Sequence, residues 1–244
     1  MTDPQSAAAS AASWLSQVEE STQRLLQTVS ALKPEAVTEP SALPGWTRGH
    51  VLAHLARNAD SLVNLLTGAR TGTDIPQYAS NEARDQDIER DAPRPLDVHL
   101  ADLRASHARF AEAAALMTPE AWAATVKHRS GYLFPASDIP HKRLLELEYH
   151  HVDLAAGHGP GDWPEEFAVE EFHRLVEKLH GADLPAVEVH AQDTGRFGTI
   201  GTGTTSLTVE GPVRALAAWL SGRSAGAGLR RTPDTALPPL PPMG

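Results

Sequence analysis

The chain has 244 residues, of which 41% are hydrophobic and 21% are charged, and its formal net charge is −10. These values are typical of a globular protein with enough residues to bury a core. The negative charge and the lack of a Lys/Arg block argue against nucleic acid or an anionic membrane as a partner, because both are bound through clustered basic side chains.

The chain contains no cysteine, which excludes disulfides and metal sites built on protein thiolates. No segment approaches the roughly 18 apolar residues of a membrane-spanning helix. Residues 1–15 lack the basic flank and apolar run of a signal peptide. We therefore expect a monomer in the cytoplasm.

Apolar residues at helical spacing predict four long helices in the first part of the chain. A polar stretch at 71–95 separates the second helix from the third, and a short helix near 81–89 is expected within it. Thr47 is a candidate N-cap for the second helix and Gly68 a candidate stop. Pro95 suits the first turn of the third helix, and Gly157 suits the end of the fourth. The expected long helices cover residues 6–32, 47–67, 95–117 and 139–157.

The pattern changes after about residue 160. A helix is expected at 163–180, and alternating residues predict strands at 186–193 and 206–210. Turns are expected between the strands at four glycines, and Pro212 precedes a last helix at 213–220. The Pro-rich tail from about residue 232 is expected to lie extended on the surface or to be disordered. The glycines assigned to turns are Gly195, Gly198, Gly201 and Gly203.

The predicted fold is therefore an all-α four-helix bundle followed by a smaller α+β domain. The bundle is expected to span residues 1–160, and the second domain, with its Pro-rich tail, residues 161–244.

Histidines of the second helix are the first candidate metal ligands. On a helical projection, His50 lies ~160° from the centre of the apolar face and His54 ~120° from it, with Asn58 closer still. His54 can therefore reach toward a bundle core from the border of the buried face. A paired site of His50 and His54 would point outward and is less favoured.

The fourth helix supplies a carboxylate and an imidazole four residues apart. Glu146 and His150 are ~40° apart around the helix and ~6 Å apart along it, so they can bind one ion. Glu148 and His151 form a rival pair, and periodicity alone leaves both pairs open. With His54, either pair gives two imidazoles and one carboxylate, a ligand set typical of catalytic zinc sites. A Glu–His hydrogen bond in the core, without metal, is the alternative.

Four segments resemble the mycothiol-dependent maleylpyruvate isomerase family, and the resemblance extends over essentially the whole chain. The most specific segment is LPGWTRGHVLAHLARNAD at residues 43–60. The others are ARDQDIE at 83–89, ELEYHHVDL at 146–154 and WLSGR at 219–223.

The resemblance implies a DinB-like metal-binding four-helix domain and a second domain similar to sterol carrier proteins. It implies that His54, Glu146 and His150 bind one divalent ion, zinc, and thereby selects one of the two pairs on the fourth helix. It also implies that Arg223 is catalytically important and that the thiol mycothiol is a cofactor. The expected pathway is the degradation of gentisate, an aromatic compound.

The reaction that the resemblance implies is the isomerisation of maleylpyruvate, a dicarboxylate keto acid, to fumarylpyruvate. Addition of a metal-activated thiolate makes the cis double bond single, rotation follows, and elimination gives the trans product. Arg223 would hold a substrate carboxylate, although a surface arginine at a helix end is the alternative. Arg84 lies in the long polar segment and could reach the pocket, but a solvated loop residue is the favoured interpretation. Asp153 could orient a ligand imidazole or be a surface acid.

Three other functions stay open at this point. A mycothiol S-transferase acting on another electrophile would keep the same metal ligands. A zinc hydrolase would need a positioned general base, and no HExxH motif is present. A non-catalytic metal- or lipid-binding protein is the third alternative.

Overall fold

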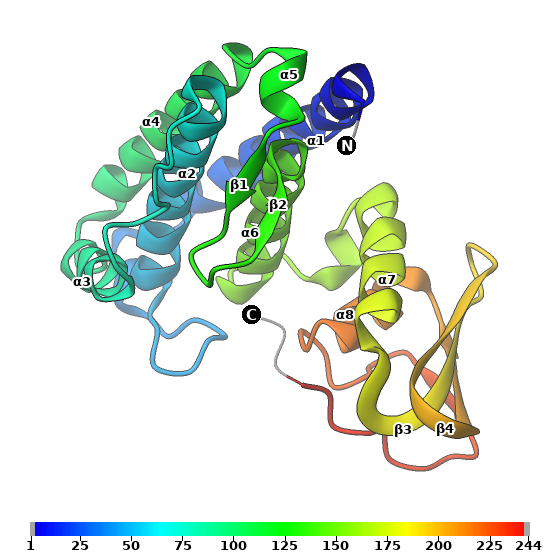
Figure 1. The fold of residues 1–244 in the computed structure, drawn as a ribbon. Coiled ribbons are helices and arrows are strands. Elements are labelled where there is room, and N and C mark those ends of the chain that lie inside the picture. Colours follow the sequence, from blue (N-terminus) through cyan, green and yellow to red (C-terminus); the bar gives the residue numbers. More distant parts are fainter. Residues whose placement is uncertain (1–2, 242–244) are drawn as a thin grey trace. The chain divides into compact units, whose positions relative to one another are not determined.

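The computed structural model describes residues 3–241, so the first two residues and the last three of the Pro-rich tail lie outside it. The chain divides into two compact units, Met1–His158 and Gly159–Gly244 (Figure 1). The division falls close to the domain boundary expected at 160/161. Among residues 3–241, none of the helices combines the length and the apolar character that crossing a bilayer requires.

The first unit is the expected helix bundle. Four long helices pack against one another: α1 contacts α4 and α6, and α2 contacts α4 and α6. Each buries an apolar face, and α2, the most buried, has Val51, Leu52 and Leu55 fully inaccessible to solvent. The long helices are α1 (Pro4–Ser30), α2 (Arg48–Thr71), α4 (Leu96–Ala115) and α6 (Ile139–Asp153).

Shorter elements connect these helices. The helix α3 (Asn81–Asp91) lies between α2 and α4, as the sequence predicts, and the Ser80 hydroxyl caps its first turn by accepting from the Ala83 N–H at 3.0 Å. The sequence did not predict α5 (Pro119–Trp122) or the antiparallel hairpin of β1 (Thr125–Lys127) and β2 (Leu133–Pro135). These elements are too short to show a period. The short 3₁₀ helices are η1 (Pro34–Thr38), η2 (Ala136–Asp138) and, in the second unit, η3 (Pro160–Asp162).

Three expected helix boundaries were wrong. Gly68 does not stop α2, which continues to Thr71 and ends at Gly72 in the left-handed conformation, with φ of 69°. Pro95 lies just before α4 as its N-cap, rather than in its first turn. Helix α6 ends at Asp153, before Gly157.

The second unit is α+β, as predicted. Its antiparallel sheet has the order β3-β4-β5, and α7 and α8 pack against β3 and β4 around one apolar core. Of the expected turn glycines, Gly195 precedes β4, and Gly201 and Gly203, with φ of 76° and 93°, lie between the two stretches of β4 that pair with residues 187–191 of β3; only Gly198 was misplaced, because it lies within a paired stretch. The elements are α7 (Glu165–Leu179), β3 (His180–Ala191), β4 (Arg196–Gly211), α8 (Val213–Leu220) and β5 (Arg230–Thr232).

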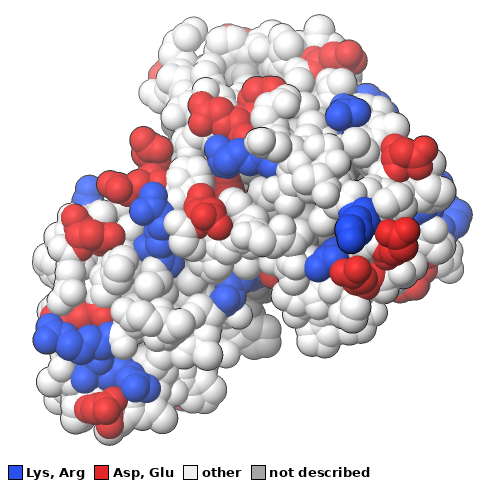
Figure 2. All heavy atoms as spheres, turned by 180° about the vertical axis from the view of Figure 1, so that it is seen from behind, with Lys and Arg blue, Asp and Glu red and all other residues white. Residues whose placement is uncertain are grey.

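The Pro-rich tail has no regular secondary structure from residue 233 to residue 241. Two of its side chains, Leu237 and Leu240, are partly buried against the core of the second unit. On the face drawn in Figure 2, basic side chains lie beside acidic ones rather than in one continuous basic patch.

A glycine fixes the distance between α2 and the segment that follows α3. A Cβ on Gly49 would lie 2.1 Å from the Ala92 carbonyl oxygen and 2.8 Å from a Val37 methyl group. Because backbone cannot move aside as a side-chain tip can, only glycine permits this approach.

We expect Gly49→Ala to lower the free energy of unfolding by about 1–3 kcal/mol through overpacking. Gly161→Ala is the control, because a Cβ there has no atom within 4 Å. Chemical denaturation of both variants measures the effect. Equal stability of the two would show that α2 does not depend on this close approach.

Candidate metal centre

Side chains from two helices of the first unit meet at one point. The Nε2 atom of His54, on α2, lies 2.8 Å from a carboxylate oxygen of Glu146 and 3.1 Å from Nε2 of His150, both on α6. The same oxygen of Glu146 lies 3.3 Å from Nε2 of His150. The sequence separation is large, but the packing of α2 against α6 brings the three groups together.

These three residues fit a divalent cation. Their ligand atoms all lie within 4.8 Å of one another. Among residues 3–241, this is the one group of three His, Cys, Asp or Glu side chains placed closely enough to bind a metal ion. Two imidazole nitrogens and one carboxylate oxygen are the protein ligands of many catalytic zinc sites, which keep a fourth position for water or substrate. His150 follows Glu146 by four residues, about one helical turn, so both side chains can bind the same ion.

Burial and hydrogen bonds together determine the protonation states of His54 and Glu146. Burial lowers the pKa of His54 to about 4, so this imidazole is neutral at pH 7 and can offer a lone pair. Burial opposes ionisation of Glu146, but hydrogen bonds from His150 and His54 outweigh it and hold the pKa well below its usual value. The carboxylate is therefore charged at neutral pH.

The rival pair on α6 faces another helix. An oxygen of Glu148 lies 2.6 Å from the Arg24 guanidinium of α1, and Nε2 of His151 lies 2.8 Å from the Thr28 hydroxyl. Glu148 is completely buried, so it needs this cationic partner. The structure thus places the rival pair toward α1, away from His54.

His50 is not part of the group. Its Nδ1 accepts a hydrogen bond from the Thr47 N–H at 3.1 Å, at the first turn of α2. Its Nε2 lies 3.3 Å from Glu89. The outward-facing pair of His50 and His54 is therefore not formed.

Asp153 orients one candidate ligand. Its carboxylate lies 2.9 Å from Nδ1 of His150, and the residue is buried, with 3% of its surface exposed. A carboxylate on the remote ring nitrogen fixes the ring and increases its basicity, as is common around metal-binding histidines. The alternative of a surface acid was wrong.

Arg84 also lies at the centre, so its expected position as a solvated loop residue was wrong. It belongs to α3, and its guanidinium lies 3.2 Å from Nδ1 of His54. The side chain is only 16% exposed and also pairs with Asp85 at 2.7 Å. The error arose because the polar segment gave no period, whereas the Ser80 cap starts a helix that directs Arg84 inward.

Three further side chains near the centre were not singled out from the sequence. Arg143 is 1% exposed and donates to the Leu55 carbonyl at 2.9 Å and to the Asn58 side chain at 2.8 Å, which ties α6 to α2. Burial, supplemented by the charge of Glu146, raises the pKa of Tyr78. The third, His128, lies in the turn of the hairpin. Burial lowers its pKa, and the charge of Glu146 partly opposes this shift.

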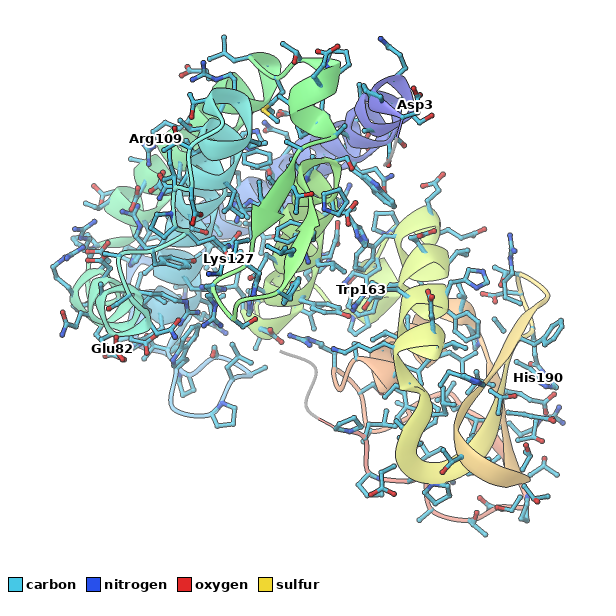
Figure 3. The ribbon with its side chains drawn as sticks, in the orientation of Figure 1. Asp3, Glu82, Arg109, Lys127, Trp163 and His190 are labelled. Atoms are coloured by element: carbon cyan, nitrogen blue, oxygen red, sulfur yellow. The ribbon has the colours of Figure 1, made fainter. Side chains whose placement is uncertain are left out.

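Arg223 belongs to the second unit. It follows α8, and its guanidinium donates to the Ser221 carbonyl at 3.0 Å. Its catalytic role stays a prediction. Figure 3 shows the side chains on the ribbon, with Lys127 marking the hairpin of the first unit and Trp163 the start of the second.

Residues 18–155 match the model of the mycothiol maleylpyruvate isomerase N-terminal domain family. The chain belongs to this family. The matched region is more than half of the chain and contains all three candidate ligands. A comparison with curated proteins gave no significant match.

Two solved structures resemble this member of the family over nearly its whole length. The crystal structure of the mycothiol-dependent maleylpyruvate isomerase has a TM-score of 0.87 and 27% sequence identity, and the match covers 95% of this chain and 96% of that one. The structure of a histidine-to-alanine mutant of that enzyme has a TM-score of 0.86, with the same identity and coverage.

We expect His54→Ala to abolish retention of the metal, because it removes one of three protein ligands. His50→Ala is the matched control, since this histidine lies one turn earlier on the same helix and outside the group. Elemental analysis of the purified variants gives the metal content. Full content in the His54 variant would show that the ligand assignment is wrong.

We expect Asp153→Asn to weaken metal binding by about 10–100-fold, the usual effect of losing a carboxylate behind a ligand histidine. Competition with a chelator measures the affinity. Asp97→Asn, at an exposed position on α4, should leave it unchanged. An unchanged affinity in the Asp153 variant would remove its proposed role.

Proposed function

We propose that this protein isomerises maleylpyruvate to fumarylpyruvate, with mycothiol as the thiol and zinc held by His54, Glu146 and His150. The observation that carries the proposal is the convergence of these three side chains within a chain that matches the family. In the same context we expect a monomeric, cytoplasmic enzyme of gentisate degradation.

The centre has the properties that thiol chemistry needs. A divalent cation there would stabilise the thiolate form of a bound thiol at neutral pH. The chain contributes a neutral imidazole at His54, a charged carboxylate at Glu146 and a fixed ring at His150. Since the chain has no cysteine, the nucleophilic sulfur has to come from outside.

The substrate would be isomerised by addition of the thiolate, rotation about the resulting single bond, and elimination of the thiolate. Addition of the thiolate to the carbon–carbon double bond forms a C–S bond and an enolate, and the former double bond can then rotate. Elimination breaks the same C–S bond and returns the thiolate with the trans product. No oxidant or net proton is needed.

Arg84 is suited to bind the anionic substrate. A guanidinium only donates hydrogen bonds, so at its 3.2 Å contact Nδ1 of His54 accepts. When Nε2 of His54 serves as a ligand, the neutral ring carries its proton on Nδ1 and no longer accepts from Arg84. The guanidinium is then available for a carboxylate or the enolate oxygen, which it can bind in bidentate fashion.

Arg223, in the second unit, is proposed as a catalytic residue that binds a carboxylate of the substrate. Support comes from the WLSGR segment and from the match to the solved enzyme structure over 95% of the chain, which includes the second unit. A bidentate guanidinium–carboxylate pair suits this task better than a lysine would.

We expect isomerisation of maleylpyruvate only when both mycothiol and the metal are present. The purified protein is assayed spectroscopically with and without the thiol, before and after chelation, and after zinc is added back. Turnover without thiol would contradict the proposal. Thiol conjugation without isomerisation would instead assign the protein as an S-transferase.

We expect Arg84→Ala and Arg223→Ala each to lower kcat/KM by about 10–100-fold, the effect of losing a hydrogen bond to a charged group. Arg70→Ala, at the exposed end of α2, is the control and should behave as wild type. Steady-state kinetics measures the effect. Unchanged values in either variant would remove that arginine from the mechanism.

A further inference from the structure

A cluster of aromatic rings and one cation lies on the hairpin and on α6, outside the proposed ligands. We call it the hairpin cluster: His128, Tyr132, Phe134 and Lys142. The rings of His128 and Tyr132 stack with centroids 4.5 Å apart and an angle of 21°. The Lys142 amine lies 4.5 Å from the centroid of Phe134 and donates to the Tyr132 hydroxyl at 2.9 Å.

One aromatic ring of the cluster is open to solvent. Tyr132 is 48% exposed although His128 covers one face of its ring. The Lys142 amine lies over that ring, 5.2 Å from its centroid, and the Phe134 ring lies 5.8 Å away at an angle of 46°. The exposed part of the Tyr132 ring lies beside an amine, so a ligand could meet an apolar surface and a hydrogen-bond donor together.

The cluster lies about one helical turn from the candidate metal ligands. Lys142 precedes Glu146 by four residues on α6, so the two side chains lie on one face, ~6 Å apart along the axis. On the hairpin, burial and the nearby cations lower the pKa of His128, whereas the charge of Glu146 raises it, which agrees with this proximity.

Hydrogen bonds hold the hairpin beside the segment that leads into α3. The Arg129 N–H donates to the Gln77 side chain at 2.7 Å, and the Arg129 guanidinium donates to the Asn81 side chain at 3.0 Å. Tyr132 is therefore displayed on a fixed turn. The same bonds join the hairpin to the start of α3, the helix that carries Arg84.

The cluster is suited to a sugar. The C–H face of a six-membered polyol ring stacks on an aromatic face, while its hydroxyls accept from an amine and donate to a phenol oxygen. Mycothiol carries such a group, because its cysteine is linked to a glucosamine–inositol pseudodisaccharide. The cysteine is about one extended residue long, ~3.5 Å of backbone plus a side chain, which is comparable to one helical turn.

We propose that Tyr132 and Lys142 bind the glucosamine–inositol part of the thiol cofactor, while its sulfur reaches the centre at His54, Glu146 and His150. This inference rests on the proposed function, since it assigns a second contact surface to the same thiol. It also assigns a use to an exposed tyrosine that neither the metal ligands nor the bundle core requires.

The test uses the full-length, metal-containing protein and the cysteine-free glucosamine–inositol pseudodisaccharide, titrated by calorimetry. We expect binding to the wild type and an affinity at least about tenfold lower for Tyr132→Ala. Leu133→Ala is the matched control, because this neighbour is 67% exposed and its loss should not change the affinity. Absence of binding to the wild type, or equal affinity in the Tyr132 variant, would overturn the inference.

Kinetics separates this inference from the proposed function. With mycothiol, Tyr132→Ala should raise the thiol concentration for half-maximal rate about tenfold, and with N-acetylcysteine it should change nothing. If the wild type and Tyr132→Ala isomerise maleylpyruvate with the same dependence on mycothiol concentration, the sugar site is overturned and the proposed function still stands. Tyr132-dependent binding of the pseudodisaccharide by a protein that does not isomerise maleylpyruvate would support the site and reject the function.

Discussion

The partly buried carboxylate of Glu146 is the constraint on which the packing of α2 against α6 depends. A charged carboxylate inside a bundle is costly unless cations or donors surround it. Here His150 of the same helix and His54 of α2 contact the same oxygen, and the contact from His54 forms only when α2 and α6 pack in this register. Arg143 strengthens this register, since its guanidinium joins α6 to the Leu55 carbonyl on α2. The group that serves the proposed chemistry therefore also fixes how α2 and α6 pack.

On the opposite side of α6, a second Glu–His pair also has polar partners on a neighbouring helix. Glu148 pairs with Arg24 of α1, and His151 contacts Thr28 of the same helix. Rotating α6 would separate Glu148 from Arg24 and Glu146 from His54. Buried pairs of this kind contribute specificity more than net stability. They explain how a helix with apolar residues on nearly every side still has one orientation.

Periodicity in the sequence predicts the helices because each long helix buries one apolar face. It does not choose between Glu146 and Glu148, because both lie among apolar residues, and only the family resemblance selects the former. The position of Arg84 depends on the Ser80 cap and on the packing of α3 rather than on any local pattern. The hairpin strands have three residues each, too few for an alternation to be recognised. Gly68 does not end α2, and its missing Cβ allows the Thr73 carbonyl oxygen to lie close to the helix, a tertiary contact that a local pattern does not reveal.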